Sequence, residues 1–212
     1  ILICFDIFLL ILTFIAYKRN KYLKVDLKFP KFTLLDRIFF IIPIFFPILS
    51  VLGAFILNNH GPNIITMIML GGIAVYVFCV VLFRHKLNEN IFPWALWMIG
   101  LSLLFMISLR GNYISSGDIG IEFLMFKLNL SHFRWSITYL QHAYNAMLSI
   151  TILPSIFFYL FNIRPEEIFL IIYPLFFSLI GILVYIIANK FVSNSLSFIA
   201  GIFYIIQNPF IT

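Results

Sequence analysis

The chain has 212 residues, of which 63% are hydrophobic, 19% aromatic and only 10% charged, and its mean hydropathy is +1.08. A water-soluble domain carries about 25% charged residues, so this composition excludes an ordinary soluble protein and indicates a membrane protein whose first partner is the lipid bilayer. The formal net charge is +6, but the basic residues crowd one loop and do not interleave with aromatic ones, so we expect no nucleic-acid partner.

Apolar runs of membrane-crossing length follow one another along the chain. A helix needs about 20 apolar residues to cross a ~30 Å hydrocarbon core, and these runs lack the alternation of a β-barrel strand. The sequence therefore predicts an all-α fold, a polytopic bundle of transmembrane helices. The predicted spans are residues 1–17, 34–58, 64–83 and 91–109, followed by less regular apolar blocks at 143–161 and 167–188 and a last run from 196.

Both ends of the chain are expected to be cut from a longer protein. The opening run, ILICFDIFLLILTFIAY, has Asp6 inside it and no small-residue cleavage site, so it is typical of a truncated span and not of a signal peptide. The last run stops at Thr212, where a span would just be ending. We expect N-terminal transmembrane helices, about three spans, in residues 1–90 and the start of a second transmembrane module in residues 91–212.

The distribution of Lys and Arg predicts the orientation of the spans. The loop of residues 18–33 holds the densest basic cluster, and loops rich in Lys and Arg stay in the cytoplasm. Alternation places Arg84 and Lys86 on the cytoplasmic side as well, which agrees with the same rule. The 91–109 span then runs outward and delivers a loop of residues 110–142 to the external face of the cell membrane.

The block of residues 143–161 has two readings. It crosses the membrane inward, or it lies along the membrane surface as a helix broken near Pro154. In the first reading Lys190 is external; in the second the 167–188 span crosses inward and Lys190 is cytoplasmic. A single lysine does not decide between the two.

The external loop, RGNYISSGDIGIEFLMFKLNLSHFRWSITYLQH, is much longer than a plain connector. Long loops with apolar residues of their own are disproportionately functional. The run SSGD before IGIEFLMFKL predicts the start of a short helix, with Ser115 and Asp118 in capping-box spacing or Asp118 itself as the N-cap. The tripeptide from Asn129 to Ser131 matches an N-glycosylation acceptor, a match that is frequent by chance.

Asp118 and Glu122 share one face of that predicted helix, with about 5–6 Å between their Cβ atoms. Two carboxylates this close can share a divalent cation such as Mg²⁺ or Mn²⁺, or one can act as a base or an acid because its neighbour raises its pKa. In the plainer reading Asp118 caps the helix and Glu122 is solvated. The cations of the same loop either bind an anionic substrate group or reach toward lipid phosphates; they are Arg110, Lys127 and Arg134.

Three runs carry a resemblance to a known family. GDIGIEF, followed by HAYNAMLSITILPSIFFYLFNI and then IFLIIYPLFFSLIGILVYII, resembles an uncharacterised archaeal family of multi-pass membrane proteins, and that family is similar to the GT-C superfamily of polyprenyl-phosphate-dependent glycosyltransferases. The similarity covers about residues 91–212. It implies an outward span, an external loop with a catalytic acid, a juxtamembrane helix at 143–161 and an inward span at 167–188. Gly120 departs from the family pattern, which often has His after Asp-Ile.

The resemblance implies transfer of a sugar from a polyprenyl-phosphate donor to a glycan or protein acceptor at the external membrane face. Asp118 would be the base, alone or with Glu122, and the same pair would hold a divalent cation if one is used. The run NAMLSITILP would flank a groove for the polyprenyl tail, or it is ordinary helix packing. The residues expected to bind substrate are Arg110, Arg134, His142 and Tyr144.

Two other classes of function remain open. A non-catalytic assembly or scaffold protein can keep the same fold, because fold does not imply function. A transporter or channel would carry ionisable residues along its path through the membrane, and the predicted spans hold almost none beyond Asp6 and the boundary pair Asp36 and Arg37.

Overall fold

The computed structural model describes residues 32–111, 114, 117–132, 135–136 and 142–207. Within these ranges all regular structure is helical, which confirms the predicted all-α class. The predicted span 1–17 and nearly all of the basic loop 18–33 lie outside the described residues.

In the part of the chain that the structure describes, four helices are long and apolar enough to cross a membrane, and they coincide with predicted spans to within a few residues. The first is continuous over α2 (Leu34–Ile41), η1 (Ile42–Ile44) and α3 (Phe45–Asn58); the second is α4 (Ile64–Leu82) and the third α5 (Ile91–Ser108). The fourth, Pro165–Ala188, joins α8 (Pro165–Glu167), the π-helical turn η3 (Ile168–Ile172), α9 (Tyr173–Phe177) and α10 (Ile180–Ala188). Shorter helices complete the described chain: α6 (Asp118–His132), η2 (Ala143–Ala146), α7 (Leu148–Phe161) and α11 (Asn194–Ile206).

The boundary acid Asp36 has a structural role. Its carboxylate is buried and accepts hydrogen bonds from the backbone and hydroxyl of Thr33, both at 2.9 Å, which forms a capping box at the start of α2. It also accepts from the backbone N–H of Asn88 at 2.8 Å. These donors offset part of the free-energy cost of burying the charge. Because one of them is the backbone of Asn88, Asp36 also ties the loop before α5 to the start of α2.

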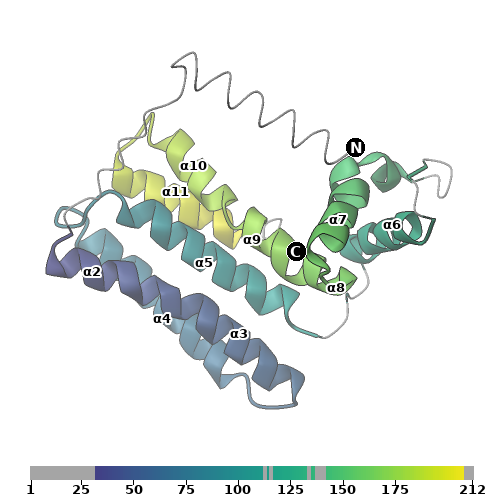
Figure 1. The fold of residues 1–212 in the computed structure, drawn as a ribbon. Helices are drawn as coiled ribbons and strands as arrows, with labels where there is room; N and C mark the ends of the chain where they lie inside the picture. The colour runs from purple at the N-terminus through teal and green to yellow at the C-terminus, as the bar shows by residue number, and fades with distance from the viewer. Residues whose placement is uncertain (1–31, 112–113, 115–116, 133–134, 137–141, 208–212) are drawn as a thin grey trace. The chain divides into compact units, whose positions relative to one another are not determined.

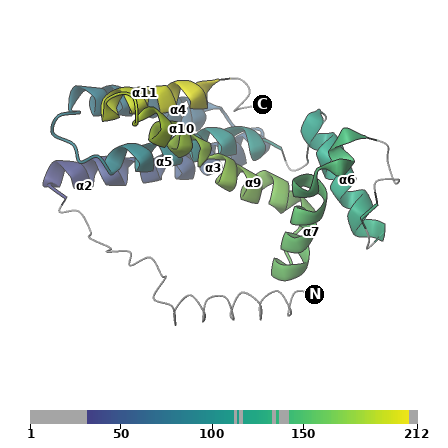
Figure 2. The same ribbon diagram turned by 90° about the horizontal axis from the view of Figure 1, so that it is seen from above.

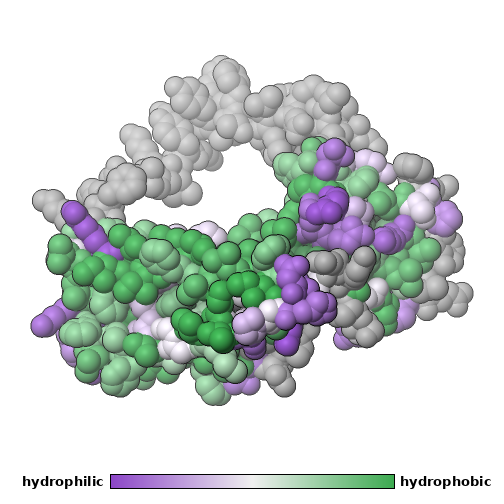
Figure 3. Space-filling model, turned by 90° about the horizontal axis from the view of Figure 1, so that it is seen from below, coloured by the Kyte–Doolittle hydropathy of each residue, from purple (hydrophilic) through white to green (hydrophobic). Residues whose placement is uncertain are grey.

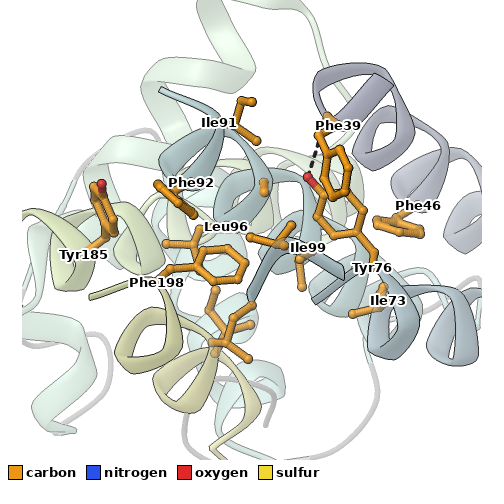
Figure 4. Close-up of a cluster of buried hydrophobic side chains, with 14 of the residues drawn as sticks. Phe39, Phe46, Ile73, Tyr76, Ile91, Phe92, Leu96, Ile99, Tyr185 and Phe198 are labelled. Carbon is orange, nitrogen blue, oxygen red and sulfur yellow. Dashed lines mark hydrogen bonds between the residues drawn. The ribbon is translucent and has the colours of Figure 1, made fainter. Parts of the chain in front are cut away.

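Helix α5 is the central helix of the bundle (Figure 1). Just over half of it is buried, 56%, against 22 to 28% for the other three spans. It packs against α3 on one side and against α10 and α11 on the other. Figure 4 shows this core, in which Phe92, Leu96 and Ile99 of α5 lie among buried side chains from the neighbouring helices, and the Tyr76 hydroxyl donates to the Phe39 carbonyl at 2.7 Å.

The fourth span runs antiparallel to α5. Phe92, at the start of α5, lies beside Tyr185 near the end of the fourth span, with ring centroids 6.3 Å apart. At the other end the Ser108 hydroxyl donates to the carbonyl of Leu170 at 2.9 Å. The chain therefore leaves α5 and enters the fourth span at the same end of the bundle.

Helices α6 and α7 lie at that end (Figures 1 and 2). They pack against each other, and α7 also contacts η3. Residues 148–161 thus lie beside α6 and the start of the fourth span, and this apolar helix is shorter than the helices long enough to cross a membrane. Pro154 stands inside α7 without ending it.

Large hydrophobic side chains cover the outside of the bundle, as they do on helices that face lipid. Phe55, Phe78 and Phe203 are each about two-thirds exposed. Figure 3 shows hydrophobic residues over the bundle and hydrophilic ones gathered toward the end where α6, α7 and α8 lie. A surface of this kind is stable in a bilayer and not in water.

Helices α10 and α11 cross closely because two glycines face each other there. A Cβ built on Gly201 would lie 2.8 and 2.9 Å from the two methyl carbons of Leu96 and 3.3 Å from the Gly181 carbonyl oxygen. Leu96 is fully buried, so its side chain has no free space into which to move. Small residues that let helix backbones approach are typical of membrane bundles.

Gly201→Ala should therefore destabilise the bundle by about 1–3 kcal/mol, because the added methyl overpacks the core. Gly71→Ala is the matched control, since no atom lies within 4 Å of a Cβ built at that position on α4; it should be neutral or slightly stabilising. Thermal unfolding in detergent micelles, followed by circular dichroism, measures both. Equal melting temperatures for the two variants would contradict this account of the crossing.

Candidate functional site

The two carboxylates singled out from the sequence lie at the start of α6. The helix begins at Asp118, and the carbonyl of Gly117 accepts the first helical hydrogen bonds, from the backbone N–H groups of Gly120 (3.1 Å) and Ile121 (3.3 Å). Gly117 has a φ of +116° and is the N-cap. The reading of Asp118 as the N-cap is thus wrong, and Ser115, the other partner of the expected capping box, lies outside the described residues. Asp118 is an exposed first-turn acid, where the helix dipole favours negative charge.

Glu122 follows one turn later on the same face and is half-buried. Burial raises its pKa above the ordinary glutamate value, and the negative charge of Asp118 raises it further. The predicted proximity of the two carboxyl groups is thus present in the structure. A carboxyl group with a raised pKa binds a proton more readily, which is the property that a catalytic acid or base needs near neutral pH.

Tyr144 on η2 joins this pair. The pKa of its phenol is raised by partial burial, by the Asp118 charge and by the Glu122 charge, so the Tyr144 side chain lies close to both carboxylates. The sequence predicted Tyr144 as a substrate-binding residue, and the structure places it beside the acid pair.

His142 stands beside Tyr144. Its Nδ1 accepts a hydrogen bond from the backbone N–H of Tyr144 at 3.3 Å, which caps η2, and the two rings lie 4.8 Å apart between centroids. The imidazole is exposed. Asp118, Glu122, Tyr144 and His142 together form the acid cluster, built from the first turns of α6 and from η2.

Tyr173 is a member of this neighbourhood that the sequence did not point out. It comes from the fourth span, its hydroxyl donates to the Ser149 carbonyl at 2.6 Å, and it lies within reach of the Glu122 charge. It follows directly after the π-helical turn η3, and such turns are frequent at functional sites. A tyrosine before a proline in an otherwise apolar span was the available signal, but a hydrophobic periodicity does not show which helix it faces.

The predicted cations of the 110–142 loop differ in their surroundings. Arg110 follows α5 and is exposed, and no hydrogen bond or ion pair joins it to the described residues of the acid cluster. Arg134 lies outside the described residues. Lys127 pairs with Glu166 at 3.5 Å and covers the ring of Phe123, so it ties α6 to α8. Of the expected substrate-binding residues that the structure describes, Tyr144 lies next to the carboxylates and His142 lies next to Tyr144.

Arg164, which was not predicted as a site residue, precedes the fourth span. Its Nε donates to Glu167 at 2.8 Å, and this hydrogen bond with the Glu167 charge raises the pKa of the guanidinium group. Arg164 and Glu167 line a hollow of about 630 Å³ together with Asn58. The rest of this hollow, the α3–α8 hollow, is largely apolar and is formed by the spans, with Ala54, Leu170 and Ile171 among its lining residues.

The run NAMLSITILP, expected to flank a lipid groove, borders a much smaller hollow. The α6–α7 hollow has about 220 Å³ and is lined by Thr151, Ile152 and Ser155 from α7 and by residues from α6 and the loop after it. This volume is below the ~300–1,000 Å³ of drug-sized ligand sites and is too small for a long lipid tail. Asn129, the first residue of the possible glycosylation tripeptide, is buried here and is not accessible for modification.

The acid cluster offers two carboxylates to a metal ion. Within the described residues no third His, Cys, Asp or Glu completes a group with them. Mg²⁺ is held in many transferases by one or two carboxylates together with substrate phosphates and water. Asp118 and Glu122, one helical turn apart, fit that kind of site.

Comparisons with protein-family models, with curated proteins and with solved structures found no match for this chain. The assignment of function therefore depends on the site itself.

The coupling of the two carboxylates predicts a pH-dependent effect. Because folding raises the Glu122 pKa, the stability contributed by its protonated form is complete below the ordinary value of 4.5 and is lost as the pH rises through the raised value. Over this pH range the free energy of unfolding of the wild-type protein should fall relative to that of Glu122→Gln.

Asp118→Asn should lower the Glu122 pKa, because it removes the neighbouring charge. Carbon-13 NMR titration of the Glu122 carboxyl in both proteins measures this, and an unchanged pKa would contradict the coupling.

Proposed function

We propose that this chain belongs to a membrane glycosyltransferase of the GT-C type, which transfers a sugar from a polyprenyl-phosphate donor at the external face of the membrane. The observation that carries the proposal is the acid cluster: two carboxylates one turn apart, one of them half-buried with a raised pKa, at one end of a bundle of helices long and apolar enough to cross a membrane. The resemblance of residues 91–212 to that superfamily agrees with it.

The chemistry requires a base next to the acceptor. The acceptor hydroxyl oxygen bonds to the anomeric carbon of the sugar, the bond from that carbon to the phosphate oxygen breaks, and its electron pair leaves with the phosphate. The hydroxyl proton passes to the Asp118 carboxylate, which lies beside the Tyr144 side chain. Glu122 lies one turn further in, and its raised pKa lets it share that proton.

The departing phosphate gains negative charge, which a cation beside it would stabilise. The exposed imidazole of His142 lies next to Tyr144, and since its Nδ1 accepts from the Tyr144 backbone N–H, its Nε2–H is a neutral hydrogen-bond donor for that phosphate. A divalent ion held by Asp118 and Glu122 would supply the same stabilisation as a Lewis acid.

The α3–α8 hollow suits the lipid part of the donor. Its apolar wall belongs to membrane-spanning helices, and its polar side chains lie at the end of the bundle where α6 is also found; they are Asn58, Arg164, Glu166 and Glu167. Lys127 of α6 pairs with Glu166, which lines this hollow. An amphiphile with its tail in the bilayer would thus present its headgroup beside α6.

Asp118→Asn tests the base. Asparagine keeps the size of the side chain but does not take up a proton, so transfer should fall by about a hundred- to ten-thousand-fold. The assay follows labelled sugar from polyprenyl phosphate into the acceptor, in membranes that hold the full-length protein. Glu89→Gln, an exposed acid in the loop before α5, is the matched control and should transfer at the wild-type rate. A folded Asp118→Asn protein with wild-type transfer would exclude the base role.

A further inference from the structure

A buried polar group further along α6 lacks a partner. Asn129 is only 6% exposed; its Nδ2 donates to the Met125 carbonyl (2.8 Å) and to Asn145 Oδ1 (3.3 Å). Its Oδ1 has no hydrogen-bond partner within the described part of the chain. Turning the amide round would place Oδ1 against two acceptors, because Asn145 uses its own Nδ2 to donate to Ser136. A buried acceptor without a donor is costly and calls for a ligand or water.

Asn129 lines the α6–α7 hollow, whose other polar groups also offer acceptors. The hydroxyl of Thr151 donates to the Met147 carbonyl at 3.1 Å and that of Ser155 to the Thr151 carbonyl at 2.9 Å. Each hydroxyl has given its proton to the helix backbone, so each presents lone pairs. A group that fills the hollow must therefore bring several hydrogen-bond donors of its own.

The remaining lining is aromatic and uncharged. Trp135 and Tyr159 are 39% and 56% exposed beside the hollow, and Leu130 and Ile152 complete it. The Trp135 indole N–H already donates to the Asn145 carbonyl at 3.0 Å, so the faces of the indole ring are the part that can contact a ligand. Among the described residues that line the hollow, none is Lys, Arg, Asp, Glu or His, which disfavours a phosphate or a cation as the occupant.

We propose that the α6–α7 hollow binds one neutral sugar ring. Such a ring brings hydroxyl donors to Asn129, Thr151 and Ser155 and sets its apolar C–H faces against Trp135 or Tyr159. The volume of about 220 Å³ is that of a single-ring site. In the proposed function this hollow holds the acceptor or the transferred sugar, and that role rests on the proposed function. The binding of a sugar ring in the hollow does not depend on it.

Saturation-transfer NMR of the detergent-solubilised full chain tests the proposal, with glucose, mannose, galactose and N-acetylglucosamine as probes. At least one of these sugars should bind saturably. Ser155→Leu places a bulky side chain in the hollow and should abolish binding. Asn129→Leu removes the unpaired acceptor and should weaken binding by about fivefold, the effect of one neutral hydrogen bond.

Ser149→Leu is the matched control, because it adds the same side chain to an exposed position of α7 that does not line the hollow; it should bind like the wild type. If Asn129→Leu does not fold, Ser155→Leu decides. Absence of saturable binding to every probe, or wild-type affinity in Ser155→Leu, would overturn the proposal and leave the hollow a hydration site. Asp118→Asn should bind sugar normally, so a loss of the base role leaves this inference standing.

Discussion

The antiparallel packing of α5 against the fourth span fixes the position of every candidate functional group. Phe92 meets Tyr185 at one end and the Ser108 hydroxyl meets the Leu170 carbonyl at the other. Because α5 is the most buried span, it cannot shift without disturbing the whole bundle. The segment between these two helices must therefore begin and end at one place, and α6, η2 and α7 fold back on each other there.

That segment carries polar chemistry at the edge of an apolar bundle. Asp118, Glu122 and Asn129 stand on one face of α6, at helical spacing, and η2 and α7 pack against the helix. Near an apolar surface charged and polar groups are poorly solvated, which raises the pKa of Glu122 and makes the Nδ2 of Asn129 depend on partners such as Asn145. The same environment strengthens any interaction with a substrate that displaces water. The acid cluster and the α6–α7 hollow thus lie one after the other along α6.

Much of the fold was predictable from the sequence, because length and hydropathy decide which segments cross a membrane. The spans at 34–58, 64–83 and 91–109 agree closely with the helices, and the Asp118–Glu122 pair followed from spacing alone. The predicted N-cap of α6 was wrong, because the chain adopts a left-handed φ at Gly117 and that residue, not Asp118, is the N-cap. Tyr173 and Asn129 were missed because their roles depend on contacts between helices, and the burial of Asp36 depends on a loop more than fifty residues away.

The proposed activity depends on the acid cluster lying at the external face, and cysteine accessibility in intact cells measures this most directly. The exposed residues Ser131, at the end of α6, and Glu89, before α5, are each replaced by Cys in a protein whose native Cys4 and Cys79 are replaced by Ser. A membrane-impermeant thiol reagent should label the cysteine at 131 in intact cells and the cysteine at 89 only after permeabilisation. Labelling at 89 but not at 131 in intact cells would place the carboxylates in the cytoplasm and contradict the account.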